Sequence, residues 1–172
     1  MMRQVCRLTQ ETSCCFSGYR PEKLPWRTHE DDPRCQALKR KIETELAQLY
    51  QAGMRHFFCG MARGSDMYFC EAVLKLREAH PEITIEAAIP CEAQAARWNE
   101  WERSRYFNLV SQCDVETFVS REYTRDCMVR RNRYMVDNSA VLLAVYDGKF
   151  GGTMQTIEYA ARKGLKVITI AP

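Results

Sequence analysis

Short apolar runs alternate with amphipathic segments along this chain of 172 residues, and the alternation constrains its fold more than any other feature. The runs have the length of single strands, and several are apolar at consecutive positions, which is typical of strands buried on both faces. We expect about six strands, at residues 12–16, 55–59, 83–89, 115–119, 140–146 and 165–170.

Helix signals fill the intervals between these runs. Asp32-Pro33 is typical of an N-cap followed by proline at the first helical position, and Gly53 is placed to end that helix. We expect further helices from the loop at residues 60–66 to Pro81, over residues 92–112 and 124–137, and after Gly152.

Repeated β–α units with buried strands favour a parallel sheet that helices cover on both faces. Right-handed crossovers and short connections then favour a doubly wound, Rossmann-like α/β fold with a mostly parallel sheet. The chain is long enough for a substantial core and contains no internal repeat or linker. We therefore expect residues 1–172 to form a single domain.

Composition and charge exclude several classes of protein. No apolar run approaches the ~20 residues of a membrane span, and residues 1–7 lack the apolar segment of a secretory signal. The nine cysteines include no Cys-x-x-Cys pair, so we expect reduced thiols in a cytoplasmic protein, with neither metal nor cofactor. A net charge of +3 is too small to indicate a nucleic-acid partner.

The loop after the expected strand at residues 140–146 has the strongest functional signal. Gly151-Gly152-Thr153 precedes a helix, and such a sequence presents free backbone N–H groups and the positive helix end to a phosphate. Glu158 lies one to two turns into that helix, where a carboxylate suits a sugar or a reacting centre better than a phosphate. Glu158 and Arg162 also have the spacing of an ion pair on an exposed face.

The loop at residues 60–66 repeats this strand–glycine–helix pattern. Gly64 and Ser65 can present donors to an anion, and Arg63 can reinforce them. The alternative is a tight turn in which Ser65 or Asp66 caps the helix and no ligand is needed. Two such loops at one sheet edge favour ligand binding, because ligands of these sheets bind outside the carboxyl ends of the strands.

Five arginines at residues 121–133 have a solvated face as their ordinary interpretation. Arg131, however, shares a helical side with Met128 and Met135, and a buried arginine needs an anion. That anion is either a carboxylate, for which Glu158 is a candidate, or a ligand phosphate.

Taken together, these segments resemble the YpsA-like family of the SLOG superfamily. The similarity lies in Ser17-Gly18-Tyr19-Arg20-Pro21 and in residues 60–66, 131–137, 144–148 and 151–160. The resemblance implies a Rossmann-like domain with a pocket for a nucleotide or a nucleotide-derived ligand. Roles in cell division and stress responses have been proposed for that family.

A more distant similarity is to the LONELY GUY phosphoribohydrolases, which release a base from a nucleoside 5′-monophosphate. Arg131, between two methionines, and Glu158, after the glycine pair, match the catalytic arginine and glutamate of those enzymes. The sequence departs from their pattern at Asn132, in place of a lysine, and at Met154-Gln155, in place of glycine-threonine.

We therefore expect a mononucleotide or an ADP-ribose-like molecule to bind at the carboxyl edge of the sheet. The residues expected to contact it are Ser17, Gly18, Arg20, Gly60, Arg63, Gly64, Ser65, Asp66, Asn132, Tyr146, Asp147, Gly151, Gly152, Thr153 and Thr156. If the protein is an enzyme, Glu158 and Arg131 cleave an N-glycosidic bond. The third alternative is binding of single-stranded nucleic acid along the arginine cluster, with Trp98 or Trp101 stacking on bases. This alternative arises because the DNA-processing protein DprA belongs to the same superfamily. The sequence leaves open whether the protein forms a homodimer.

Overall fold

The computed structural model describes residues 9–172, and the prediction that residues 1–7 contain no secretory signal lies outside them. It confirms the α/β fold: six parallel strands form one sheet, in the order β4-β3-β2-β1-β5-β6. The strands are β1 (Ser13–Ser17), β2 (His56–Cys59), β3 (Thr84–Ile89), β4 (Val115–Phe118), β5 (Val141–Val145) and β6 (Lys166–Ile170). Each lies within two residues of its predicted position.

Five α-helices connect the strands. They are α1 (Pro33–Gln51), α2 (Ser65–Ala79), α3 (Glu100–Gln112), α4 (Cys127–Asp137) and α5 (Gly152–Arg162). A short 3₁₀ helix, η2 (Pro21–Lys23), follows β1. As predicted, Asp32 caps α1, because its side chain accepts a 2.8 Å hydrogen bond from the backbone N–H of Arg34.

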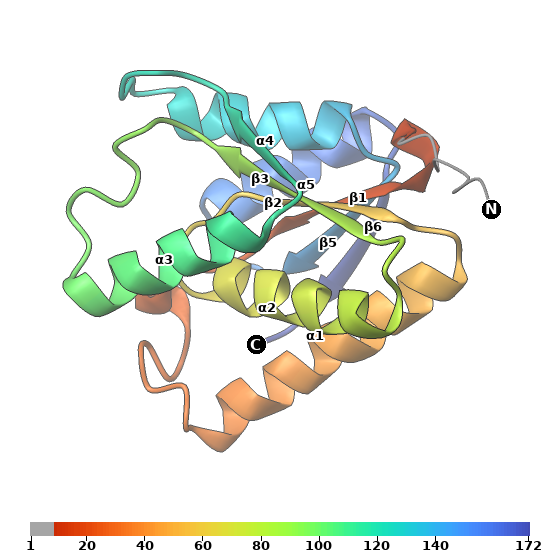
Figure 1. Cartoon of the computed structure of the whole chain (residues 1–172), viewed down its shortest axis with the longest axis horizontal. Helices are drawn as coiled ribbons and strands as arrows, with labels where there is room; N and C mark the ends of the chain where they lie inside the picture. The colour runs from red at the N-terminus through yellow and green to blue at the C-terminus, as the bar shows by residue number, and fades with distance from the viewer. Residues whose placement is uncertain (1–8) are drawn as a thin grey trace.

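Helices cover both faces of the sheet, so the structure has three layers (Figure 1). On one face, the larger core packs α1, α2 and α3 around residues such as Phe16, Phe57 and Phe69. On the other face, α4 and α5 pack against the sheet around Met135, Val136 and Ala160. The eight cysteines among residues 9–172 are free thiols, and seven of them are buried. In this part of the chain, no helix combines the length and apolarity needed to cross a membrane.

The predicted helix over residues 92–112 is wrong in its first part, because α3 begins only at Glu100. Asn99 and Glu102 form a capping box, which fixes the helix start at that point. The preceding segment forms turns, and Gln94 anchors it by donating hydrogen bonds to the carbonyl groups of Gly60 (3.3 Å) and Met61 (2.7 Å).

The chain reverses its direction of winding between β1 and β5, which are neighbours at the centre of the sheet. Cys14 pairs with Phe57 of β2 on one side and with Val141 of β5 on the other. The loops that leave β1 and β5 therefore diverge and open a crevice at the carboxyl edge of the sheet. Such a switch point is where doubly wound sheets bind their ligands.

Candidate functional site

A hollow of about 320 Å³ lies at this switch point. Its wall comes from the segment after β1, from α4 and from the start of α5, and it is made of Ser17, Gly18, Tyr19, Arg20, Glu22, Lys23, Met128, Asn132, Gly152 and Thr153. Six of the residues expected to contact a ligand meet here: Ser17, Gly18, Arg20, Asn132, Gly152 and Thr153.

The start of α5 presents unused hydrogen-bond donors to the hollow. Gly151 is the N-cap residue and has no side chain, so no side chain satisfies the first N–H groups of the helix. Ser17 and Thr153 are only 8% and 7% exposed, and within residues 9–172 their hydroxyl groups have no hydrogen-bond partner. Neither hydroxyl oxygen is fully buried, so both groups are open to the hollow and free to bind an acceptor-rich ligand.

Cationic side chains stand beside these donors. The Lys23 ammonium donates a 2.6 Å hydrogen bond to the backbone carbonyl of Phe150, and Arg20 approaches the sulfur of Met128 at 3.8 Å. The nearby carboxylate of Glu22 is already paired with Arg63. The hollow therefore combines a positive helix end with two cations, which favours an anion.

A second hollow, of about 360 Å³, continues along the groove between α4 and α5. It shares Met128, Asn132 and Gly152 with the first hollow, and Glu158 lines it. Glu158 is exposed, and among residues 9–172 its carboxylate has no hydrogen-bond or ion-pair partner. The ion pair with Arg162, considered from the sequence, is therefore not formed.

Arg131 is buried, as its helical position predicts, but it does not contact Glu158. Its guanidinium donates hydrogen bonds to the carbonyl group of Gly60 and to the side chain of Asn132, the latter at 2.7 Å. Burial lowers the pKa of Arg131, and the nearby carboxylate of Asp66 opposes that change. The interpretation in which Arg131 holds Glu158 is wrong, because the arginine bonds instead to backbone carbonyls and to the Asn132 side chain.

Asn132 connects Arg131 to the start of α5. Its amide donates a 3.0 Å hydrogen bond to the hydroxyl of Thr156, which in turn donates to the carbonyl of Gly152 at 2.8 Å. Thr156 therefore contributes to the switch-point hollow through these hydrogen bonds and does not line it. The amide links α4 to α5 and fixes the position of the helix end that faces the site.

In the second glycine loop, at residues 60–66, hydrogen-bond donors already have partners within the protein. Both the backbone N–H and the hydroxyl of Ser65 donate to the carbonyl oxygen of Tyr19, at 3.0 and 2.8 Å. Asp66 accepts a 3.0 Å hydrogen bond from the Ala62 N–H, and Arg63 is paired with Glu102 and Glu22. Gly60, Arg63, Gly64, Ser65 and Asp66 do not line the hollow, so this loop has a structural role. The N-cap of α2 is Gly64, and the expected cap by Ser65 or Asp66 is wrong.

Tyr19 organises the loop that follows β5. Its hydroxyl donates to the carboxylate of Asp147 at 2.7 Å and accepts from the backbone N–H groups of Asp147 and Lys149, each at 3.3 Å. The hydrogen bond from Tyr19 lowers the pKa of Asp147, and Lys149 lowers it further. Tyr146 packs edge-on to Tyr19, with ring centroids 6.3 Å apart. Tyr146 and Asp147 thus support the site without lining the hollow.

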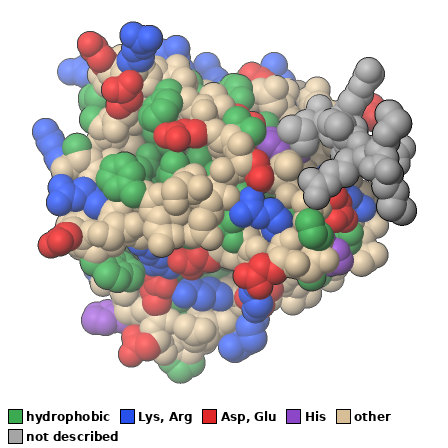
Figure 2. Space-filling model, in the orientation of Figure 1, with side chains coloured by type: hydrophobic (Ala, Val, Ile, Leu, Met, Phe, Trp, Pro, Cys, Tyr) green, Lys and Arg blue, Asp and Glu red, His purple; other side chains and the backbone are tan. Residues whose placement is uncertain are grey.

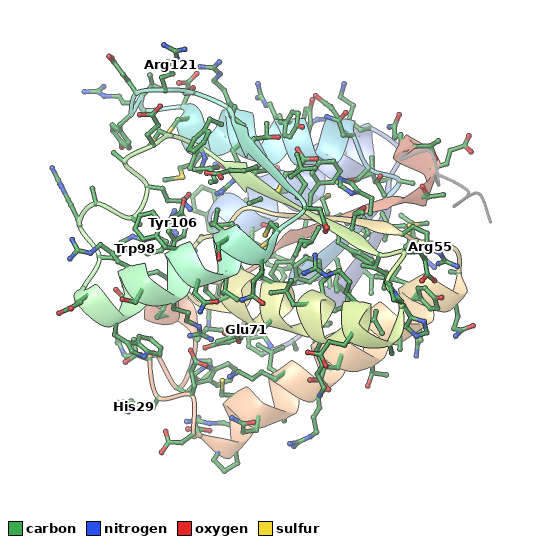
Figure 3. All side chains as sticks on the ribbon, in the orientation of Figure 1. His29, Arg55, Glu71, Trp98, Tyr106 and Arg121 are labelled. Atoms are coloured by element: carbon green, nitrogen blue, oxygen red, sulfur yellow. The ribbon has the colours of Figure 1, made fainter. Side chains whose placement is uncertain are left out.

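Sequence reasoning missed Tyr19 and Lys23 as site residues, although both lie within or just after the segment 17–21 that it singled out. The aromatic residues suggested for base stacking lie elsewhere: Trp98 packs edge-on to Tyr106 at 5.3 Å, beside α3 (Figure 3). Trp101 is 61% exposed on the same helix. Neither tryptophan lines the switch-point hollow.

An all-parallel, doubly wound sheet with an open helix start at its switch point defines a Rossmann-like protein with a candidate anion site. A model of the YpsA family, described as "YspA SLOG family", matches residues 14–167. The chain belongs to this family of the SLOG superfamily. Similar proteins include a UPF0398 protein of Bacillus pumilus, 27% identical over 80% of this chain and 74% of that protein. Another, from Halalkalibacterium halodurans, is 27% identical over 86% and 79%.

The fold also resembles those of two solved DNA processing proteins A. DprA from Streptococcus pneumoniae aligns with a TM-score of 0.62 and 13% identity, over 94% of this chain and 51% of that one. DprA from Helicobacter pylori, solved for its single-stranded DNA binding mode, aligns with a TM-score of 0.62 and 15% identity, over 94% and 65%. The chain thus spans about half to two thirds of these proteins, and at these identities the likeness shows the fold alone.

Proposed function

We propose that this protein binds a phosphate-bearing nucleotide or nucleotide derivative in the switch-point hollow, as a sensor. The observation that carries the proposal is the start of α5. There, within residues 9–172, uncapped backbone donors, two hydroxyls without partners and two cations face one hollow. Phosphate oxygens accept several such hydrogen bonds at once, and the positive helix end attracts their charge.

The dimensions support a ligand of nucleotide size. The two connected hollows measure about 320 and 360 Å³, each within the usual range of small-molecule sites of about 300–1,000 Å³. A phosphate at the start of α5 places the rest of the ligand in the groove between α4 and α5. Glu158 and Asn132 there offer polar groups that suit sugar hydroxyls.

Thermal unfolding in the presence of AMP, ADP-ribose, NAD and inorganic pyrophosphate tests the proposal. A ligand at 100 times its dissociation constant stabilises the folded state by about 2.7 kcal/mol. We expect at least one ligand to raise the unfolding temperature of the wild type, and Thr153→Val to lose most of that shift. Thr44→Val, on the distant helix α1, is the matched control and keeps it. The absence of a shift with every phosphorylated ligand contradicts the proposal.

A second candidate function is hydrolysis of the N-glycosidic bond of a nucleotide. The observation that favours it is the unpaired carboxylate of Glu158, about 9 Å along the helix axis from Gly152, in the hollow that continues the anion site. Such a carboxylate can stabilise the positive charge that develops on the sugar in the transition state. Release of free base from a panel of nucleoside 5′-monophosphates by the wild type, but not by Glu158→Gln, establishes this activity. Binding without base release by either protein identifies a sensor.

The third candidate is single-stranded nucleic acid, favoured by the fold shared with DprA. The face formed by α1, α2 and α3 carries side chains of both charge signs interspersed, which does not suit a nucleic-acid backbone (Figure 2). Arg121 stands on the loop before α4, at the carboxyl edge (Figure 3). Oligonucleotide affinity that exceeds AMP affinity and falls steeply with salt selects this candidate.

A further inference from the structure

Two lysines lie at nearly the same distance from the ring of Tyr19, but they have different surroundings. The ammonium group of Lys23 is 5.5 Å from the ring centroid, and that of Lys149 is 5.7 Å from it. Lys149 has a carboxylate partner, since it pairs with Asp147 at 3.0 Å. Lys23 lines the hollow and, within residues 9–172, has no carboxylate within ion-pair distance.

The ammonium group of Lys23 lies at the start of α5, on the side where the helix dipole attracts anions. The ammonium contacts the residue before α5, because a β-carbon on Gly151 would overlap it. A cation beside the positive end of a helix is repelled by the helix dipole. The hydrogen bond to the Phe150 carbonyl compensates for part of this repulsion. A phosphate at the same place would satisfy Lys23 and the helix end together.

Lys23 also joins two loops that are far apart in the sequence. It extends from η2 to the loop after β5, where Phe150 precedes the glycine pair. The side chain of Phe150 is 76% exposed, so the hydrogen bond holds this residue only through its backbone. Release of Lys23 therefore removes one hydrogen-bonded attachment of this loop to the segment after β1, while the hydrogen bonds of the Tyr19 hydroxyl remain.

We propose that Lys23 is the displaceable cation of the site: it binds the Phe150 carbonyl in the free protein and transfers to a ligand phosphate on binding. The loop at residues 147–151, with the exposed Phe150 ring, is then released from Lys23 and changes its position. This inference rests on the proposed function, since it requires a phosphate-bearing ligand. Ser17 and Thr153 are the independent sign that the helix start takes a ligand, because both residues are more than nine-tenths buried and their hydroxyls have no partner within residues 9–172.

Calorimetric titration of Lys23→Met and Lys149→Met with AMP, ADP-ribose and inorganic pyrophosphate tests the first part. A charge-assisted hydrogen bond contributes about 1.5–3 kcal/mol, so we expect Lys23→Met to weaken binding by about tenfold or more. Lys149→Met, which removes the same charge beside the same ring, should change the affinity by less than about threefold. Circular dichroism verifies that both variants are folded.

A tryptophan reporter tests the second part. In Phe150→Trp, saturation with whichever of AMP, ADP-ribose and inorganic pyrophosphate binds the wild type should shift the tryptophan emission. In the double variant Lys23→Met/Phe150→Trp, whose loop is already released, saturation should leave it unchanged.

The outcomes separate the two proposals. If the wild type binds a phosphorylated ligand and Lys23→Met binds it equally well, the role of Lys23 is wrong and the proposed function stands. If none of these ligands binds to the wild type, both proposals fail. If affinity falls in Lys23→Met but the reporter does not respond, Lys23 is a ligand-binding residue and the displacement from Phe150 is wrong.

Discussion

From the sequence we expected Gly60 and Arg131 to contact a ligand, but in the structure they contact each other. The guanidinium of Arg131 lies directly on the backbone of Gly60, where a β-carbon would come within 2.7 Å of the Arg131 Cζ atom. A glycine at this position therefore makes room for a buried arginine. The arginine in turn satisfies the Gly60 carbonyl and positions Asn132, which faces the hollow.

We predict that Gly60→Ala lowers the free energy of unfolding by about 1–3 kcal/mol, because the added methyl group overpacks the Arg131 site. Gly152→Ala is the matched control, since a β-carbon there meets no atom within 4 Å. Alanine favours a helix over glycine, so this control should be as stable as the wild type or slightly more stable. Urea unfolding of the three proteins gives the comparison, and equal midpoints for Gly60→Ala and the wild type contradict the packing argument.

We also predict that Arg131→Met destabilises the fold by about 1–3 kcal/mol, because it leaves the buried carbonyl of Gly60 without its hydrogen bond and removes the cation near the buried carboxylate of Asp66. Burial already raises the pKa of Asp66, and Arg131 opposes that rise. The measurement is urea unfolding, with Arg130→Met on the exposed side of the same helix as control. A stable Arg131→Met variant that no longer binds nucleotide instead gives Arg131 a ligand-binding role.

Only one of the two glycine loops that the sequence singles out borders the switch-point hollow. Both have the same local pattern, but the acceptor that occupies Ser65 is the Tyr19 carbonyl, 46 residues earlier. Lys23 was missed for a similar reason, since its partner Phe150 lies 127 residues away. Local patterns indicate where donors are exposed in the chain, and tertiary contacts decide which of them remain free.

Helix α4 carries site residues on one side and a buried polar network on another. Its Tyr134 hydroxyl donates to the Glu86 carboxylate of β3 at 2.6 Å. His56 of β2 and Thr117 of β4 also contact this carboxylate, at 3.1 and 2.7 Å. Glu86 therefore ties α4 to three adjacent strands of the sheet.

We predict that this network makes folding stability depend on pH in the acidic range. Burial alone would raise the pKa of Glu86, but hydrogen bonds from His56, Tyr134 and Thr117 outweigh it and lower the pKa below its ordinary value of 4.5. A carboxyl group with a lowered pKa in the folded state contributes stability above its ordinary pKa and loses it as the pH falls through the lower, folded value. Unfolding midpoints between pH 7 and pH 3 should therefore fall less steeply for Glu86→Gln than for the wild type.

Glu116→Gln, on the exposed edge strand β4, is the control and should retain the wild-type pH profile. A parallel loss of stability in Glu86→Gln and the wild type over this range would show that other carboxyl groups determine the acid sensitivity.

Strands and helices were easier to predict than their boundaries. The apolar runs and the Asp32-Pro33 start are local signals, and they gave all six strands and the first residue of α1. The late start of α3 was missed because residues 92–99 are held by a long-range contact, from Gln94 to the loop at residues 60–66. The family resemblance and the crossover rules gave the parallel, doubly wound sheet, which local patterns alone do not order.

The helices on both faces pack against the same sheet. The prediction of a single domain over residues 1–172 therefore has a direct test. Trp26 is buried in the larger core, whereas the smaller core under α4 and α5 contains no tryptophan. If the layers unfold together, tryptophan fluorescence and far-ultraviolet circular dichroism should follow the same urea transition. A fluorescence transition separated from the dichroism transition shows that the layers unfold independently.

The adjacency of β1 and β5 has a consequence for the protein during its synthesis. One wall of the hollow is made within the first residues after β1, and the other requires α4 and the start of α5, more than a hundred residues later. A nascent chain grows from its N-terminus, so β1 to β4 emerge from the ribosome before the central partner strand of β1 exists. The unfinished chain exposes one edge of β1 and lacks the second wall of the hollow. A molecule that binds in this hollow can therefore stabilise the protein only after α5 has formed, and cannot assist the first half of the chain in folding.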